Sequence, residues 1–342
     1  MASDDALIPP GKLPGHILER LLREYITLDP SVVVGPGIGR DAAAVRVGDR
    51  VIVVKTDPIT FAKADAGRYL VHVNANDIAC MGATPRWLLV TALLPERSTT
   101  AGLVEDIFRS IAVASRELNI ALIGGHTEIT LGLDRSILVG QMIGEIDEAG
   151  LLDISDAAPG DAILLCSAIA IEGTAILAME ARAALSRIDA SIVERASRLL
   201  VEPGISVLPA ARALRRSGLP LKGLHDPTEG GIATALAELS AASGIGVAVD
   251  LDAIPILPET RAICDELGLN PLGLIASGSL LAVLPAHYVD RAIDALAAAG
   301  IHAVSIGHML DRGSASEALS RGTAGPMPAF PVDEIARFFT RA

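Results

Sequence analysis

The sequence predicts a two-domain protein of the α/β (α+β) class, in which helices cover sheets whose strands are aliphatic. Its 342 residues exceed the roughly 100–200 residues that one domain usually takes. Hydrophobic residues make up 51% of the chain, enough for sizeable cores, but aromatic residues make up only 3%. The cores must therefore consist of Ala, Val, Leu and Ile, as in buried strands covered by helices. Asp, Glu, Gly and Pro cluster at 145–160, so we predict domains of residues 1–150 and 151–342.

The first half alternates helical and strand patterns. Apolar residues at helical spacing predict the helices, and two apolar runs separated by Gly48-Asp49 predict a β-hairpin. Gly82 follows one helix at the position where a glycine commonly ends it. In chain order, the expected elements are a helix at 13–27, a glycine-rich loop at 35–41, a hairpin of 42–47 and 51–56, a helix at 65–80, a strand at 87–94, a helix at 100–117, and strands at 119–123 and 136–144.

The second half repeats this alternation. Thr228 stands just before a helical segment and suits the role of its N-cap. In chain order, the expected elements are a strand at 162–166, a helix after Ile171-Glu172-Gly173-Thr174, a helix at 232–243, a strand at 246–250, a helix at 258–267, a strand at 279–284, a helix at 287–299, a strand at 301–306 and a short amphipathic tail at 330–342.

Charge and cysteine content argue against several classes of protein. The chain has 28 Lys and Arg against 41 Asp and Glu, a net charge of −13, so neither nucleic acid nor an anionic membrane is an expected partner. It contains no stretch of about 20 apolar residues that would span a membrane. Cys80, Cys166 and Cys264 are scattered and odd in number, which argues against a disulfide framework. We expect a cytoplasmic protein without a signal peptide, in which these cysteines are structural.

Four aspartates stand where a metal site is expected. Asp41 follows the glycine-rich loop and Asp57 ends an apolar strand. Asp77 lies in a mostly apolar helix, and Asp226 precedes another helix. α/β proteins place ligand groups at such element ends, and Mg²⁺ prefers oxygen ligands together with substrate phosphates. A cap or a surface charge is the commoner role for any single aspartate, but the set predicts one or two cations between phosphates.

The helix at 65–80 carries polar residues that are costly to bury. His72 and Asn76 share one face, and Val73 and Asp77 share the adjacent one. A buried polar group without a partner costs about 1–3 kcal/mol. Either one face of this helix is polar and exposed, as at a subunit interface, or these groups bind something, and the residues alone leave both possibilities open.

Gly124-Gly125-His126-Thr127-Glu128 follows a predicted strand and suits phosphate binding. Its two glycines permit close backbone approach to a ligand. His126 suits phosphate contact or acid–base work, and Glu128 suits a metal ion. The alternative is a tight turn with solvated side chains.

Thr228-Glu229-Gly230-Gly231 opens a helix whose unpaired N–H groups suit an anion, although an ordinary capped helix would look the same. Lys55 and Asp57 share one face of a strand, where an inward lysine suits phosphate and an outward one contacts only solvent. We expect His225 to be a core histidine. No GxxxxGK[ST] motif occurs, so the chain is not a P-loop protein.

The order of these motifs resembles the superfamily of aminoimidazole ribonucleotide synthetase (PurM-like), thiamine-monophosphate kinase, selenophosphate synthetase and HypE. The resemblance extends from about Gly35 to about His308. Its most specific part is Asn76-Asp77-Ile78-Ala79-Cys80-Met81-Gly82-Ala83-Thr84-Pro85. Asp226-Pro227-Thr228-Glu229-Gly230-Gly231 looks most like the HypE branch of hydrogenase maturation factors.

The resemblance implies a homodimer, in which the N-terminal domains pair to form an intersubunit β-barrel and a C-terminal α/β domain packs beside each. It also implies ATP and Mg²⁺ as cofactors and a small-molecule substrate. The resemblance implies Asp41, Asp57, Asp77 and Asp226 as metal and phosphate ligands. With the roles that the residues themselves suggest for His126 and Glu128, the predicted metal ligands are Asp41, Asp57, Asp77, Glu128 and Asp226, and the predicted catalytic residues are Asp57, Asp77, His126 and Asp226. The implied nucleotide-binding residues are Gly37, Gly39, Asp41, Lys55, Asn76, Gly124, Gly125, Thr127, Thr228 and Gly230.

Three departures from the family pattern bear on the activity. Arg40-Asp41 stands where many relatives have two acidic residues, and His126 stands where the HypE and kinase branches usually have Asp. No cysteine follows Cys264, whereas HypE forms a nitrile on a terminal cysteine. We therefore expect an ATP- and Mg²⁺-dependent enzyme that activates or phosphorylates an oxygen of a small molecule. The alternatives are a kinase resembling thiamine-monophosphate kinase, and a nucleotide-binding accessory protein that has lost catalysis and acts through a protein partner.

Overall fold

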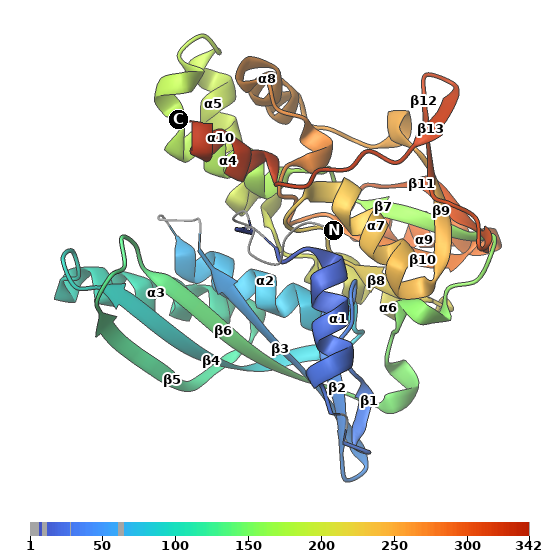
Figure 1. The fold of residues 1–342 in the computed structure, drawn as a ribbon, viewed down its shortest axis with the longest axis horizontal. Helices are drawn as coiled ribbons and strands as arrows, with labels where there is room; N and C mark the ends of the chain where they lie inside the picture. Colours follow the sequence, from blue (N-terminus) through green and yellow to red (C-terminus); the bar gives the residue numbers. More distant parts are fainter. Residues whose placement is uncertain (1–6, 9–11, 28, 61–64, 342) are drawn as a thin grey trace.

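The computed structural model describes residues 7–8, 12–27, 29–60 and 65–341 and confirms the α/β class. Two lobes, each built around one sheet, are visible in Figure 1. Helix α1 (Gly15–Tyr25) lies beside both. Within the described ranges, no helix is both long and apolar enough to cross a bilayer.

The N-terminal lobe is a six-stranded sheet with the strand order β1-β2-β3-β6-β4-β5. Helices α2 (Ala66–Cys80) and α3 (Ala101–Leu118) pack against it (Figure 1). Neighbouring strands are antiparallel except for β4 and β5, which run parallel because α3 crosses between them. The strands are β1 (Val32–Val34), β2 (Ala43–Val47), β3 (Arg50–Ile59), β4 (Thr84–Pro95), β5 (Ala121–Thr130) and β6 (Ile137–Ile146).

The C-terminal lobe is a seven-stranded sheet with the order β13-β12-β9-β11-β7-β10-β8. Its interior strand β7, between β11 and β10, is buried along its whole length, as its aliphatic sequence predicts. The strands are β7 (Asp161–Cys166), β8 (Gly223–His225), β9 (Ile245–Asp250), β10 (Leu280–Pro285), β11 (Ala303–Arg312), β12 (Glu317–Ser320) and β13 (Thr323–Pro326). The helices are α4 (Ile171–Glu180), α5 (Ala190–Arg198), α6 (Leu208–Arg216), α7 (Gly231–Ser243), α8 (Pro258–Leu267), α9 (Val289–Ala298) and α10 (Glu334–Arg341).

Helix α2 is enclosed between the two lobes. It contacts β3, β4 and β6 on one side and α6 and β8 on the other. Every residue from Tyr69 to Cys80 is buried, which excludes an exposed polar face in this chain. The polar groups of α2 are therefore satisfied inside the protein or face an internal pocket.

Strand β5 differs from the expectation that a strand ends at residue 123 and a turn follows. The strand continues to Thr130, and Gly125 pairs with Val90 while Glu128 pairs with Leu93. At Gly125, φ is 144°, and an added Cβ would collide with the carbonyl oxygen of Val90. This glycine therefore permits a close approach of two strands, and the prediction of a phosphate-approaching turn is wrong for the single chain.

Most other expected elements are present within a few residues of their predicted bounds. Helices α5 and α6 and the β12–β13 hairpin were not predicted. The expected tail helix is α10, which begins at Glu334, and residue 342 lies outside the described residues. Residues 147–160 connect the two sheets, at the position where we predict the domain boundary.

Candidate functional site

A pocket of about 670 Å³ contains residues of both lobes and of the segment before α10. The glycine-rich loop, β3 and α2 contribute from the N-terminal lobe, and β8 and α7 contribute from the C-terminal lobe. Of the predicted site residues, those that line this pocket are Gly37, Gly39, Asp41, Lys55, Asp57, Asp77, Asp226 and Thr228.

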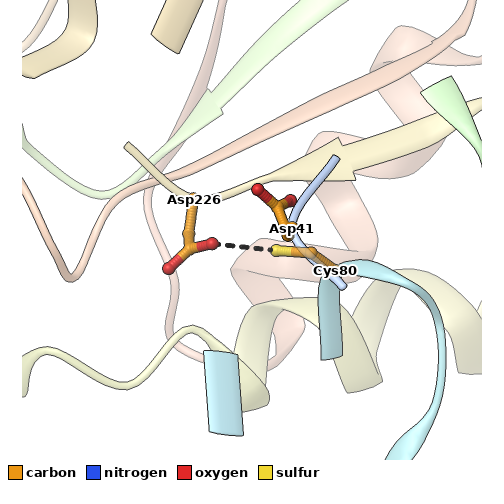
Figure 2. Close-up of side chains that lie close together, drawn as sticks. All are labelled: Asp41, Cys80 and Asp226. Atoms are coloured by element: carbon orange, nitrogen blue, oxygen red, sulfur yellow. Dashed lines mark hydrogen bonds between the residues drawn. The ribbon is translucent and has the colours of Figure 1, made fainter. Parts of the chain in front are cut away.

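Asp41 and Asp226, which both line this pocket, lie close to the buried Cys80, which Figure 2 shows at the end of α2. One potential ligand atom from each of the three lies within 4.8 Å of the others. The Cys80 thiol donates a hydrogen bond to Oδ1 of Asp226 over 3.5 Å. Burial and the nearby carboxylates raise the pKa of Cys80 well above its ordinary value, so the thiol stays protonated. Cys80 therefore acts as a hydrogen-bond donor at the site and is not merely structural.

The Asp226 carboxylate lacks a full set of partners. Its Oδ2 atom is buried and has no hydrogen-bond partner among the described residues. Burial, together with the negative charge of Asp41, raises its pKa to about 7. Two carboxylates this close repel each other unless a cation lies between them. Mg²⁺ prefers such oxygen ligands, so the residues present fit the predicted metal.

Asp77 and Lys55 form an ion pair beside this cluster. Lys55 Nζ lies 3.1 Å from Asp77 Oδ2, and the Asp77 side chain is only 4% exposed. Burial by itself lowers the pKa of Lys55, but Asp77, Asp57 and Asp41 outweigh it and hold the pKa above its ordinary value. Lys55 is therefore charged and points into the pocket, which confirms the inward orientation and excludes the outward one.

His225 is buried as predicted, but it is part of a charged network. Its Nδ1 lies 2.8 Å from Asp41 Oδ1, and its Nε2 lies 3.1 Å from Glu238 Oε2. Glu238 also accepts a hydrogen bond from Lys12 over 3.1 Å. Burial alone lowers the pKa of His225, but Asp41 and Glu238 raise it well above the ordinary value. The ring is therefore an imidazolium that balances part of the negative charge at the site.

The glycine-rich loop is held against both lobes. Gly39 has φ of 71°, and an added Cβ would collide with the backbone of Glu238, so only glycine fits there. Arg40 donates to Asp153 over 3.0 Å and to the Gly35 carbonyl over 3.4 Å. The arginine that replaces an acidic family residue thus fastens the loop.

Residues 124–128 do not reach this pocket in the single chain. They lie on β5 at the edge of the sheet, and Gly124 to Thr127 line a separate cavity of about 330 Å³. His126 Nε2 contacts Glu128 Oε2 over 3.3 Å, and both side chains are more than half exposed. The prediction that His126 and Glu128 join the aspartates is therefore wrong within one chain, because strand pairing separates them.

Three predictions around helix termini also need correction. Asn76 is buried, and its side chain is hydrogen-bonded to the C-terminal lobe. Its Nδ2 donates to the Ile205 carbonyl over 2.8 Å, and its Oδ1 accepts from the Val207 N–H over 2.9 Å. It links backbone segments and does not line the pocket. The Gly230 N–H donates to Asp333, which already provides the anion expected at the start of α7. Thr228 lines the pocket, but the N-cap of α7 is Gly230.

Four polar residues near the pocket have no place among the predictions: Lys12, Glu172, Glu238 and Ser277. Glu172 lines a second cavity with Ser277, and Glu238 holds His225. Glu172 is the only charged residue in the apolar run 168–178, which is the signal that a closer reading of the sequence offers. Nothing local marks Glu238 or Ser277.

Comparisons with known proteins identify relatives of the chain along nearly its whole length. The family model described as AIR synthase related protein, N-terminal domain, matches residues 39–146, and that of the C-terminal domain matches residues 158–319. The chain is 33% identical to the carbamoyl dehydratase HypE of Cupriavidus necator over 311 residues, which covers 87% of this chain and 84% of that protein. It is 32% identical over 297 residues to a protein of Methanocaldococcus jannaschii named as a candidate hydrogenase expression/formation protein, covering 82% and 84% of the two chains.

Solved structures show the same fold. The crystal structure of a hydrogenase maturation protein HypE in complex with ATP superposes with a TM-score of 0.67 at 25% identity. The match covers 96% of this chain and 98% of that one. The two-domain PurM-like architecture is thus confirmed over nearly the whole chain.

Proposed function

Because the chain belongs to the AIR synthase related family, we propose that it is an ATP- and Mg²⁺-dependent enzyme that activates or phosphorylates an oxygen of a small molecule. The observation that carries this proposal is the close pair of carboxylates, Asp41 and Asp226, of which Asp226 Oδ2 has no partner among the described residues, in a pocket that also contains the inward Lys55. The named ATP complex of a HypE relative supports the nucleotide.

Each residue of the pocket has a chemical task in this proposal. Asp41, Asp57, Asp77 and Asp226 would hold Mg²⁺, which would neutralise charge on the phosphates. Lys55 supplies a fixed positive charge that Asp77 orients over 3.1 Å. The His225 imidazolium fixes the Asp41 carboxylate. Gly39 lets the loop backbone pack closely against Glu238 of α7, which keeps the loop at the wall of the pocket.

The relatives indicate a reaction in hydrogenase maturation, since HypE is named a carbamoyl dehydratase. A carbonyl oxygen activated by ATP would depart as phosphate, which is consistent with the oxygen activation proposed here. Release of ADP with free phosphate distinguishes this reaction from that of a kinase, which yields ADP and a phosphorylated product.

A second copy of the chain completes the enzyme in this proposal. Strand β5 is an edge strand, and its Leu122, Ile123 and Ile129 are 38%, 54% and 60% exposed. Phe108 of α3 is 45% exposed. An unpaired edge with exposed aliphatic side chains is a surface that soluble proteins normally cover. Covering it with a partner's β5 would also give His126 and Glu128 a neighbour that one chain lacks.

Calorimetric titration of ATP with and without Mg²⁺ tests the proposal. Wild type is expected to bind ATP in a Mg²⁺-dependent manner, and Asp226→Asn is expected to weaken this binding at least about tenfold, because a metal ligand is lost. Asp290→Asn, an exposed aspartate in α9, is the matched control. ATP binding that does not depend on Mg²⁺ and survives Asp226→Asn would contradict the metal site. If wild type bound no ATP, the catalytic proposal would fail, and a family scaffold with a protein-binding role would remain.

A further inference from the structure

A second cavity of about 350 Å³ adjoins the nucleotide pocket. Lys12, Asp57 and Thr228 line both spaces, so a molecule in the second cavity would lie beside the proposed metal ligand Asp57. At about 30 Å³ per water molecule, this volume corresponds to roughly a dozen waters, which suits a small metabolite. The cavity is therefore in the right place and of the right size for the molecule that reacts with ATP.

Two buried polar side chains border this cavity, and each has an atom without a well-formed hydrogen bond. Glu172 is 5% exposed and Ser277 is 1% exposed. Neither Oε2 of Glu172 nor Oγ of Ser277 has a hydrogen-bond partner among the described residues. Ser277 is the hydrogen-bonding group that Glu172 faces, and it lowers the Glu172 pKa against the larger effect of burial. Buried polar atoms of native proteins are nearly always fully hydrogen-bonded, so the hydrogen-bonding capacity that this pair leaves unused on one cavity indicates a missing ligand. Much of the remaining wall is aliphatic, from residues such as Ile176 and Ile275.

The charge around the cavity indicates the kind of ligand. Among the described residues, which omit 61–64, the acidic groups that line the cavity are Asp57, Glu172 and Glu229, and Lys12 is the one basic group. Lys12 is already paired with Glu238 over 3.1 Å. Burial raises the pKa of Glu172 to about 7, with Ser277 opposing the shift and Asp333 and Glu229 adding to it. An anionic ligand would increase this repulsion, and a cationic one would relieve it.

We infer that this cavity binds the acceptor substrate, and that the acceptor is a small amine whose ammonium group pairs with Glu172 and Ser277. The orientation of the acceptor rests on the proposed function: its ammonium group faces Glu172, and its reacting oxygen, at the other end of the molecule, faces Asp57 and the nucleotide. The aliphatic walls contact the carbon chain between the two ends. Glu172 is then a specificity residue, retained in a buried position because the ligand neutralises it.

Three probes of equal chain length test the charge preference: 4-amino-1-butanol, 1,4-butanediol and 4-hydroxybutyrate. Binding is measured by ligand-observed NMR in the presence of Mg²⁺ and a non-hydrolysable ATP analogue, and again without nucleotide. The amine is expected to bind at least about tenfold more tightly than the diol or the acid. Glu172→Gln is expected to lower the affinity for the amine to that for the diol, and Ser277→Ala to weaken amine binding by a smaller factor.

Glu194→Gln, an exposed glutamate in α5, is the matched control and should leave amine binding unchanged. Thermal melting and circular dichroism verify that each variant is folded. Any of three results would overturn the inference. The diol and the amine could bind equally well, or amine binding could survive Glu172→Gln. Alternatively, the amine could fail to bind at about 20 mM, a concentration above the KM of ordinary substrates. If the proposed function fails, wild type does not bind ATP. That result is distinct from a failure of the inference, because the probe titrations without nucleotide test the cavity by itself.

Discussion

Replacing Glu172 by glutamine is expected to stabilise the unliganded protein, and to do so more strongly as the pH rises. The pKa of Glu172 is about 7 in the folded protein, mainly because of burial, against an ordinary 4.5. Between these two values the folded state binds more protons than the unfolded chain, so the stability of wild type falls as the pH rises. The loss is complete above the folded pKa. Glutamine has no proton to lose and avoids it.

The magnitude follows from the two pKa values. Each tenfold change in an ionisation constant corresponds to about 1.4 kcal/mol, so the full difference is worth up to about 3 kcal/mol at pH 8. At pH 5 Glu172 is almost fully protonated in the folded protein, and for the unfolded chain this pH is only about half a unit above the ordinary pKa of 4.5. Most of the stability loss has therefore not yet developed, and the expected gain from Glu172→Gln falls below about 1 kcal/mol. The pH dependence separates this effect from a general change in packing.

Urea denaturation at pH 5 and pH 8, followed by circular dichroism, measures the gain. Glu194→Gln changes an exposed glutamate whose Oε2 contacts Arg182 over 3.3 Å, and it should shift the free energy of unfolding by no more than about 0.5 kcal/mol. An equal gain at both pH values, or a loss of stability at pH 8, would refute the reasoning. Either result would mean that a positive group already neutralises Glu172 in the unliganded protein.

Three further substitutions test other parts of the structure. Glu238→Gln should destabilise the protein by up to about 3 kcal/mol at pH 7, because contacts that include His225 outweigh burial and lower the Glu238 pKa to about 2. The destabilisation should shrink as the pH falls from 5 to 2, where the glutamate of wild type becomes protonated. Urea midpoints across this pH range measure the trend, and a difference that does not change with pH would contradict it. Asn76→Ala should lower the free energy of unfolding by about 2–4 kcal/mol at any pH, since two buried backbone groups lose their hydrogen-bond partner. A large drop in ATP affinity in a folded variant would instead support the predicted nucleotide-binding role of Asn76. Ile129→Asp, on the exposed face of β5, should convert a dimer to monomers in sedimentation equilibrium, and a wild type that is monomeric at about 50 μM would refute the proposed β5 interface.

Local patterns in the sequence predict much of this fold. Helix α2 and strand β3 lie close to their predicted bounds because apolar periodicity and a terminal glycine act over a few neighbouring residues. Asp41, Asp57, Asp77 and Asp226 were chosen because they stand at or near element ends or in apolar surroundings, and the structure brings all four to one pocket. Element ends converge in α/β folds, so this part of the site is open to sequence reasoning.

Other features depend on which distant segments meet. Two glycines before His126 are compatible with a turn or with a strand, and only pairing with β4 makes the segment a strand. The start of α7 suits any anion, but Asp333, about a hundred residues later, provides it. Glu172 and Ser277 border one cavity although they are also about a hundred residues apart. The sequence alone therefore determined the elements and the carboxylates, whereas tertiary structure decided which polar groups are satisfied within the chain and which remain for a ligand. Hydrogen-bond partners and uncompensated charges depend on three-dimensional proximity, which local periodicity does not encode.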